Sequence, residues 1–200
     1  MGDLRAYVGL GANLGDREGT LAAAIAALDE LPGVRVAGVS RLYATRPIGP
    51  PGQPDYRNAV AALDVRPRAT VTETATGLLR DLKGLETRFG RQPRKRWGPR
   101  ELDLDLLILG DEVVSIEDPP LTVPHRLAGE RIFVLAPLAD LAPRLRPPGW
   151  DETVVEAYRR RVAEKGSDAV RLVAVWQPTL GRWTRADASR QGRGDASSRI

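Results

Sequence analysis

Apolar side chains along the chain recur at two spacings, one typical of strands and one typical of helices. Short runs rich in aliphatic side chains predict four strands, at residues 4–10, 34–45, 56–65 and 102–109. Between them, apolar side chains at intervals of three and four residues predict two helices, over 21–31 and 71–89. No internal repeat is visible, so the pattern does not predict an array of similar units.

Residues typical of helix ends stand at the borders of both helical stretches. Asp16 precedes the first stretch as an N-cap, and Pro32-Gly33 ends it. Thr70 and Glu73 have the spacing of a capping box before the second stretch, and Gly90 follows its last apolar residue. These signals fix where both helices begin and end.

A glycine-rich turn follows the first strand. Its glycines at 9, 11 and 15 do not form the G-x-G-x-x-G pattern of dinucleotide-binding folds, and no Walker lysine follows. We therefore interpret the segment as a strand-to-helix turn.

The second half of the chain predicts further elements. A short strand at 112–116 follows 102–109 through Gly110-Asp111, which predicts a hairpin and hence an at least partly antiparallel sheet. Later segments predict a helix at 130–138 interrupted by Pro137, a surface helix at 151–164 and a last strand at 169–176. From Gly181 onward the chain is rich in Arg, Ser, Gly, Asp and Ala without periodicity, which predicts a disordered tail.

The strand at 102–109 contains two carboxylates in an otherwise aliphatic run. Side chains alternate between the faces of a strand, so Asp103 and Asp105 share one face, roughly 6.6 Å apart along the strand. Burying two like charges is costly unless a positive group neutralises them. Either a neighbouring Arg forms a salt bridge with each, or a divalent cation binds both, as Mg²⁺ does through one or two carboxylates and substrate phosphates.

A basic loop at 91–100 immediately precedes this strand and carries five cations in ten residues. The combination of an acidic pair and a cation cluster favours the metal interpretation and indicates a site for phosphate chemistry.

Composition excludes several other chemistries. The chain has no Cys, which excludes disulfides, thiolate catalysis and Cys-based metal centres, and its single His excludes a multi-histidine metal site. No apolar run approaches the length of a transmembrane helix, and Met1-Gly2 fails the myristoylation pattern because residue 6 is Ala. We therefore expect a cytoplasmic protein of essentially one domain that does not bind membranes.

The basic charge is local. The pI is about 9.8 and the net charge +4, but residues 181–200 hold five Arg and two Asp and so supply +3 of it. The remaining positive signal is the loop at 91–100, which favours a local anion site over a nucleic-acid-binding face.

Two neighbouring segments suggest a site for a flat heterocycle. Residues 47–54 contain four Pro and two Gly, which predicts a stiff, irregular loop of the kind that often binds ligands. Tyr56 and Asn58 follow on one face of the next strand. They are either an edge-strand surface or a ring and an amide that hold a polar heterocycle.

Four single residues have an ordinary structural interpretation. Glu86 and Lys83, near the end of the second helix, are expected on a solvated helix face, and Phe133 is expected in the core. His125, the only His, is more often structural than catalytic, although its place after a proline-kinked loop suits contact with a phosphate.

Six segments stand out together along the chain. They are V-G-L-G-A-N-L-G-D at the start, T-R-P-I-G-P, Q-P-D-Y-x-N-A-V, L-x-x-L-E-x-x-x-G-R, R-W-G-P-R-x-L-D-L-D-L-L and L-T-V-P-H. In this order they resemble the family of 6-hydroxymethyl-7,8-dihydropterin pyrophosphokinases. The resemblance runs from about Tyr7 to Pro148, and six motifs in order are far more specific than any one of them.

The resemblance implies a ferredoxin-like α/β (α+β) fold with a mostly antiparallel sheet flanked by helices. It also implies transfer of the terminal pyrophosphoryl group of ATP to the hydroxymethyl group of the pterin, with release of AMP, in folate biosynthesis. The implied cofactors are two Mg²⁺ ions, the implied partners are ATP and the pterin, and we take a monomer as the working expectation.

Roles for individual residues follow by matching positions. Asp103 and Asp105 would bind the metal ions and, with Arg91 and Arg100, carry catalysis. The pterin would contact Thr45, Pro47, Ile48, Tyr56, Asn58 and Phe133. ATP would contact Glu86, Arg94, Trp97, Arg100, Leu106, Thr122, His125, Arg126 and Arg131, with Trp97 in a loop that closes over the site as a lid.

The resemblance also divides the chain. We expect a catalytic domain at 1–163, a C-terminal extension at 164–180 that holds a strand, and the disordered tail at 181–200. Residues past about Ala163 have no counterpart in the family pattern.

Two rival functions use the same features. A generic metal-dependent nucleotidyltransferase would use the D-x-D pair but release pyrophosphate instead of AMP. A ferredoxin-like RNA-binding module would use the basic loop, but such modules show two or three aromatics on adjacent strands, and only 5% of this chain is aromatic.

Overall fold

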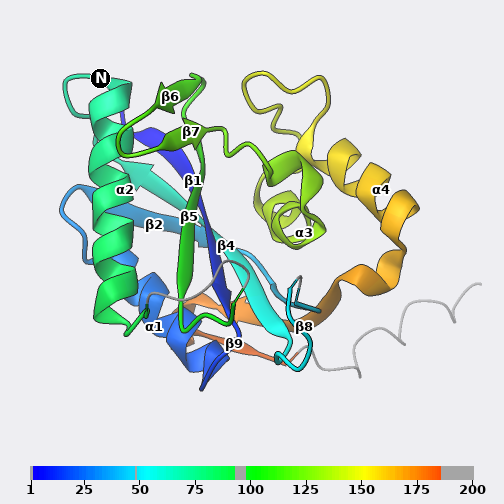
Figure 1. Ribbon diagram of the computed structural model, residues 1–200. Coiled ribbons are helices and arrows are strands. Elements are labelled where there is room, and N and C mark those ends of the chain that lie inside the picture. Colours follow the sequence, from blue (N-terminus) through cyan, green and yellow to red (C-terminus); the bar gives the residue numbers. More distant parts are fainter. Residues whose placement is uncertain (1, 48, 93–97, 186–200) are drawn as a thin grey trace, which may run out of the picture.

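The computed structural model describes residues 2–47, 49–92 and 98–185. Within these ranges the central element is a seven-stranded sheet (Figure 1). Its strands are β1 (Leu4–Ala12), β2 (Val34–Val39), β3 (Leu42–Thr45), β4 (Tyr56–Val65), β5 (Asp103–Leu109), β8 (Arg171–Gln177) and β9 (Arg182–Thr184). The main strand order is β5-β1-β4-β3-β8-β9, with β2 also paired to β4, and every pairing is antiparallel.

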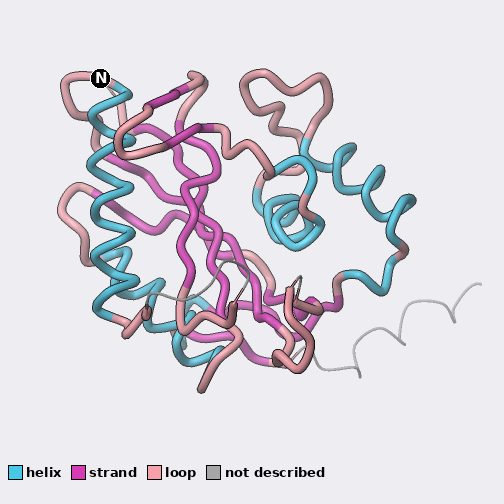
Figure 2. Tube along the Cα trace, viewed as in Figure 1, coloured by secondary structure: helices cyan, strands magenta, loops and turns pink. Residues whose placement is uncertain are grey.

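Helices cover both faces of this sheet (Figure 2). One face packs against α1 (Arg17–Asp29) and α2 (Val71–Arg88), in a core that includes Leu28, Leu82 and Leu104. The other face packs against α3 (Ile132–Leu141) and α4 (Val154–Lys165), in a core that includes Val60, Leu107 and Leu138. Among the described residues, no helix is long and apolar enough to cross a membrane.

The predicted helix starts are confirmed by their capping bonds. Asp16 Oδ1 accepts a hydrogen bond from the Gly19 N–H at 3.1 Å, and Thr70 Oγ1 accepts one from the Glu73 N–H at 3.0 Å. Such bonds satisfy N–H groups that have no partner inside the helix. The caps therefore set the position of both helices against the sheet.

The single strand predicted at 34–45 is wrong in one respect, because it is two strands. β2 and β3 both pair with β4, and the chain breaks between them at Ser40, whose N–H donates to the Val60 carbonyl at 2.9 Å. The pairing of β2 with β4 also contains a register shift, between Val36 and Gly38. The polar pair Ser40-Arg41 stands at the break, but two polar residues within an otherwise apolar run did not indicate two separate strands.

The predicted hairpin through Gly110-Asp111 is also wrong. β6 (Val114–Ile116) pairs with β7 (Leu121–Val123) in a separate two-stranded sheet, and β5 pairs with β1 instead. Val114, Leu121 and Val123 bury their side chains in the core beneath α2, and this burial stabilises the pairing of β6 with β7.

The disordered tail predicted from Gly181 is wrong for its first residues. Residues 182–184 form β9, which pairs with β8, and Trp183 is 7% exposed within the main core. The predicted last strand is confirmed as β8, and the two strands extend the sheet beyond β3. Residues 186–200 lie outside the described residues, and the expected boundary at 163/164 stays a prediction.

Candidate active site

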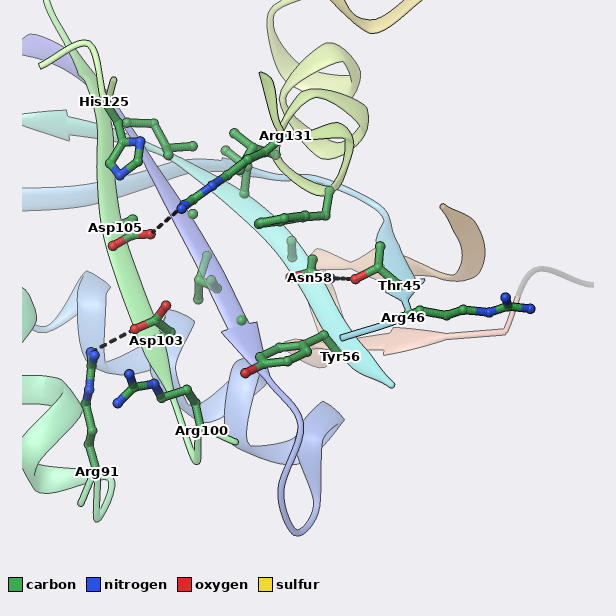
Figure 3. Close-up of a pocket in the computed structure, with 18 of the residues that line it drawn as sticks. Thr45, Arg46, Tyr56, Asn58, Arg91, Arg100, Asp103, Asp105, His125 and Arg131 are labelled. Atoms are coloured by element: carbon green, nitrogen blue, oxygen red, sulfur yellow. Dashed lines mark hydrogen bonds and ion pairs between the residues drawn. The ribbon is translucent and has the colours of Figure 1, made fainter. Parts of the chain in front are cut away.

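A pocket of about 340 Å³ opens over one face of β5, β1 and β4, beside the beginning of α3 (Figure 3). Two cross-strand rows form its floor. In one row Asp103 of β5 lies opposite Gly11 of β1, which lies opposite Asn58 of β4, and in the next row Asp105 lies opposite Gly9. The glycines leave room on the pocket floor between the two polar residues. A Cβ added at Gly11 would occupy this room, 3.4 Å from Asn58 Oδ1 and 4.0 Å from the Asp103 Cβ.

Alternation along β5 directs the two carboxylates into the pocket. Asp103 and Asp105 line it, each with about a third of its side chain exposed, whereas Leu104 and Leu106 point into the core beneath α2. The prediction that both Asp side chains share one face is confirmed. The apolar residues anchor the strand, and the carboxylates are free to meet a ligand.

Each carboxylate has a cationic neighbour (Figure 3). Arg91 Nη1 lies 2.8 Å from Asp103 Oδ1, and Arg131 Nη1 lies 4.0 Å from Asp105 Oδ2. Burial raises the pKa of Asp103, the charge of Asp105 raises it further, and Arg91 opposes both effects. The two arginines therefore leave the negative charge of the pair only partly compensated.

A buried carboxylate below the pocket holds Arg91 in place. Glu86 is 2% exposed, and its Oε1 accepts hydrogen bonds from the Leu104 N–H at 2.7 Å and from Lys83 Nζ at 2.8 Å. Arg91 forms an ion pair with the same oxygen. The expectation of a solvated helix face is wrong for Glu86, because the end of α2 packs against β5 and buries it. It is confirmed for Lys83, whose side chain is 45% exposed, although Lys83 also lines the pocket.

His125 and Arg131 lie at the end of the pocket nearest Asp105. His125 Nδ1 accepts a hydrogen bond from the Leu127 N–H at 3.2 Å, which leaves Nε2 as the N–H donor. Burial lowers the pKa of His125 and Asp105 raises it, while Arg131 and Arg126 lower it. His125 is therefore neutral at neutral pH in the absence of a ligand.

The opposite side of the pocket is mostly uncharged, although Arg46 lines it beside Thr45. Asn58 Nδ2 donates to Thr45 Oγ1 at 2.8 Å, and both residues are buried. Tyr56 lies beside them, and its hydroxyl donates to the Gly98 carbonyl at 3.2 Å. Phe133 lies in this pocket rather than wholly in the core, with the Arg131 guanidinium 5.6 Å from its ring centroid.

Asn13, which supports the site without lining the pocket, is a residue that the sequence patterns did not indicate. It is 1% exposed; its Oδ1 accepts from the Arg100 N–H at 2.7 Å, and its Nδ2 donates to Gln53 Oε1 and to the Pro54 carbonyl, each at 3.3 Å. Asn13 thus joins the segment that carries Arg100 to the proline-rich loop. Its position in the turn after β1 was the available signal, since a buried amide there must satisfy its hydrogen bonds.

Gly9 and Gly11 were also missed as site residues. Their spacing of two in a predicted strand puts them on one face, and that face is the pocket floor.

The structure gathers ten of the predicted site residues around the pocket: Thr45, Tyr56, Asn58, Arg91, Arg100, Asp103, Asp105, His125, Arg131 and Phe133. Five others do not line it: Pro47, Glu86, Leu106, Thr122 and Arg126. Glu86 acts on the pocket through Arg91, and the Leu106 side chain lies in the core. Ile48, Arg94 and Trp97 lie outside the described residues, and so does most of the predicted lid.

Together these features define a class of site. Paired carboxylates suit a divalent cation, flanking arginines suit phosphate oxygens, and a mostly uncharged wall with two aromatic rings, Tyr56 and Phe133, suits a flat heterocycle. The arrangement is that of an enzyme which transfers a phosphate-containing group to a heterocyclic acceptor.

Comparison with known proteins places the chain in one family of this class. A family model described as 7,8-dihydro-6-hydroxymethylpterin-pyrophosphokinase (HPPK) matches residues 7–143. Proteins named 2-amino-4-hydroxy-6-hydroxymethyldihydropteridine pyrophosphokinase are similar as well. The one from Pseudomonas aeruginosa is 44% identical over 144 residues, which is 72% of this chain and 84% of the relative. The one from Methylorubrum extorquens is 43% identical over 157 residues, which is 78% of this chain and 92% of the relative.

Solved structures agree on the fold. Wild-type HPPK-DHPS from Plasmodium falciparum aligns with a TM-score of 0.67 at 13% identity, over 92% of this chain and 50% of that one. This chain therefore spans about half the length of that protein. The chain belongs to the 7,8-dihydro-6-hydroxymethylpterin-pyrophosphokinase family.

Proposed function

We infer that this protein is an ATP-dependent pyrophosphokinase that converts 6-hydroxymethyl-7,8-dihydropterin to its diphosphate in folate biosynthesis. The observation that carries the inference is the cross-strand row of Asp103, Gly11 and Asn58. It sets a charged, metal-binding side and a neutral, heterocycle-binding side face to face across one pocket. Family membership assigns the two substrates to those two sides.

The charged side binds the ATP phosphates. Arg91, Arg100, His125 and Arg131 surround the carboxylates and supply donors for phosphate oxygens. Lys83 adds a further cation, because its side chain lines the same pocket. Arg94 and Trp97 keep their predicted roles as phosphate contact and lid residue, and Thr122, Arg126 and Leu106 keep theirs near the nucleotide.

Asp103 and Asp105 fit a magnesium site. The raised pKa of Asp103 reflects unfavourable negative charge that a divalent cation would neutralise, and both side chains are accessible from the pocket. We propose that the pair holds two Mg²⁺ ions together with ATP. When bound, the ions neutralise the phosphates and help the acceptor hydroxyl to lose its proton.

The neutral side binds the pterin. Tyr56 and Phe133 offer ring faces, and Asn58 and Thr45 offer hydrogen-bonding groups that suit the amide-like edge of a pterin. Pro47 and Ile48 belong to the same proposed contact surface. Because Thr45 lies on β3 and Tyr56 and Asn58 lie on β4, these three residues orient the hydroxymethyl group toward the carboxylates.

The reaction follows from this placement. The hydroxymethyl oxygen attacks the β-phosphorus of ATP, a new O–P bond forms, and the hydroxyl proton is released. The bond between the β-phosphorus and the oxygen that bridges to the α-phosphorus breaks, so that oxygen leaves with AMP. Arg91, Arg100 and Arg131 offset the charge on the phosphates, and positioning supplies most of the remaining rate enhancement.

Three broader proposals accompany this function. We propose that the fold is ferredoxin-like: β5, β1, β4 and the β2/β3 pair follow the antiparallel order expected of that fold, with α1 and α2 on one face. We also propose that the protein works in the cytoplasm, where its co-substrate ATP is abundant, and that it acts as a monomer without nucleic acid.

Product analysis tests the function directly. Purified protein is mixed with ATP, magnesium and 6-hydroxymethyl-7,8-dihydropterin, and nucleotides are separated by chromatography. We expect AMP and pterin diphosphate in equal amounts, and no AMP when either pterin or magnesium is left out. Release of pyrophosphate instead of AMP would indicate a nucleotidyltransferase, and the absence of both products from folded protein would reject the proposal.

A further inference from the structure

The neutral side of the pocket depends on a short strand. β3 contains only four residues, ends at Thr45, and pairs with β4 at Tyr56 and Asn58. A strand this short has few ladder hydrogen bonds of its own. Its position therefore depends on what pairs with its other edge.

The other edge of β3 is covered by the C-terminal segment 166–184, which contains β8 and β9. Leu42 and Tyr43 of β3 lie opposite Ala174 and Leu172 of β8. This segment lies outside residues 7–143, to which the family model extends. A strand next to the proposed pterin side is thus supplied by a part of the chain beyond the family match.

Trp183 of β9 anchors this segment at the break between β2 and β3. Its indole is buried, and Nε1 donates to the Ser40 carbonyl at 2.9 Å. The Ser40 hydroxyl oxygen accepts from the Val60 N–H at 2.9 Å, so one residue connects β9 to β4. Trp176 packs against Trp183 edge to face, with ring centroids 4.7 Å apart.

A second set of contacts joins the same segment to α3. Val170 packs in an apolar cluster with Tyr43, Ile132 and Ala136. The Tyr43 hydroxyl lies 3.0 Å from each oxygen of Asp140, which also accepts from Arg41. The cluster therefore connects β3, which carries Thr45, to α3, which carries Phe133.

We propose that the segment 166–184, anchored by Trp183, is a positioning element that fixes β3 relative to β4 and α3 and thereby sets the affinity for the pterin but not for ATP. The proposal rests on the function inferred above. None of these residues lines the main pocket, so the segment acts through Thr45, Asn58 and Phe133. The carboxylates do not depend on it, since Asp103 and Asp105 lie on β5, which β1 and β4 separate from β3.

The test compares Trp183→Phe with wild type in steady-state kinetics. Phenylalanine keeps an aromatic ring in the core but removes the N–H that bonds Ser40. We expect the KM for the pterin to rise about 3- to 10-fold, as the loss of one buried hydrogen bond allows, while the KM for ATP stays within about twofold. Leu180→Ala is the matched control, because Leu180 lies in the same segment and is 56% exposed.

A second variant covers the case in which Trp183→Phe does not fold. Val170→Ala trims the cluster around Tyr43 from the same segment, and we expect the same selective rise in pterin KM. Assays run below the melting temperature of each variant, and pterin binding is also measured by calorimetry in the presence of a non-hydrolysable ATP analogue.

Equal KM values in the folded variants and wild type would overturn the proposal, and so would parallel rises in the KM for both substrates. The proposed function fails in a different way, because wild-type protein would then make no AMP and would bind no pterin.

Discussion

The two sides of the pocket are built in opposite ways. The proposed phosphate side, formed by Asp103, Asp105 and the surrounding cations, comes mainly from one stretch of sequence, from the end of α2 to the strand β5. The proposed pterin side gathers residues from β3, β4 and the start of α3. Most of the charged residues are thus close together in the sequence, whereas the residues of the other side come from distant parts of the chain.

This difference predicts different responses to mutation. On the phosphate side each side chain bears a charge that acts on the phosphates, so its removal should affect turnover more than folding. On the pterin side each side chain belongs to a packed wall, so its removal should affect binding of one substrate. The predictions below run from the largest expected effect to the smallest.

Removal of a carboxylate should break catalysis. Asp103→Ala or Asp105→Ala should lower kcat by roughly 10³-fold or more, because a metal ligand worth several kcal/mol in the transition state is lost. Melting temperature and circular dichroism should stay close to those of wild type, since both side chains lie in the pocket rather than the core. Near-normal turnover in either variant would contradict the metal assignment.

Removal of the Asn58 amide should weaken the pterin side alone. Asn58→Ala deletes the buried hydrogen bond to Thr45 and the proposed contact to the pterin, which should raise the KM for the pterin about 10-fold. The KM for ATP should change little. Thr45→Val is a matched variant, because it keeps the shape of the side chain and removes only the hydroxyl that accepts the hydrogen bond. If both variants raised the KM for ATP more than the KM for the pterin, the assignment of the two sides would be reversed.

The single His offers a spectroscopic test of the phosphate side. Burial holds the pKa of His125 below its ordinary value, so the ring is neutral at neutral pH, and stability of the unliganded protein should fall as the pH drops through and below that ordinary value. Bound phosphates favour the charged ring and should raise this pKa.

NMR titration of the imidazole signal, unique in this chain, measures the shift with and without magnesium and an ATP analogue. An unchanged pKa in the saturated complex would place the phosphates away from His125.

The smallest predicted effect separates function from stability. Burial raises the pKa of Asp103, so the ionised form that dominates at neutral pH destabilises the metal-free protein. Asp103→Asn should therefore increase the free energy of unfolding at pH 7 slightly, because solvent screens the charge of a partly exposed group, while turnover is lost. Urea unfolding measures this free energy, and the stabilisation should become smaller as the pH is lowered and Asp103 of the wild type is protonated. A variant less stable than wild type would show that the ion pair between Asp103 and Arg91 outweighs the burial of the charge and its repulsion by Asp105.

Much of the phosphate side could be predicted because its signals are local. The alternation of Asp103 and Asp105 with leucines fixes their common face in any strand, and the capping residues Asp16 and Thr70 mark where α1 and α2 begin. The motif order identified the family and the two substrates. These features can be predicted from residues that are close together in the sequence.

The remainder was decided by tertiary contacts. Glu86 looked like a surface residue until packing of α2 on β5 buried it beneath Arg91. Gly11 became a site residue only because the ladder sets it between Asp103 and Asn58. The strand β6 was assigned the wrong partner, because pairing between strands depends on which apolar faces can be buried together.

Trp183 shows this limit most clearly. The residues around it in the sequence are typical of a disordered tail. Its large indole is nevertheless buried next to Ser40, and this burial stabilises the pairing of β9 with the sheet. By itself, the sequence determined the family, the reaction and the carboxylate pair, because these depend on local patterns of side chains. Only the tertiary structure decided the pocket floor, the support of Arg91 and the place of the C-terminal strands, because burial and long-range hydrogen bonds are properties of the folded chain.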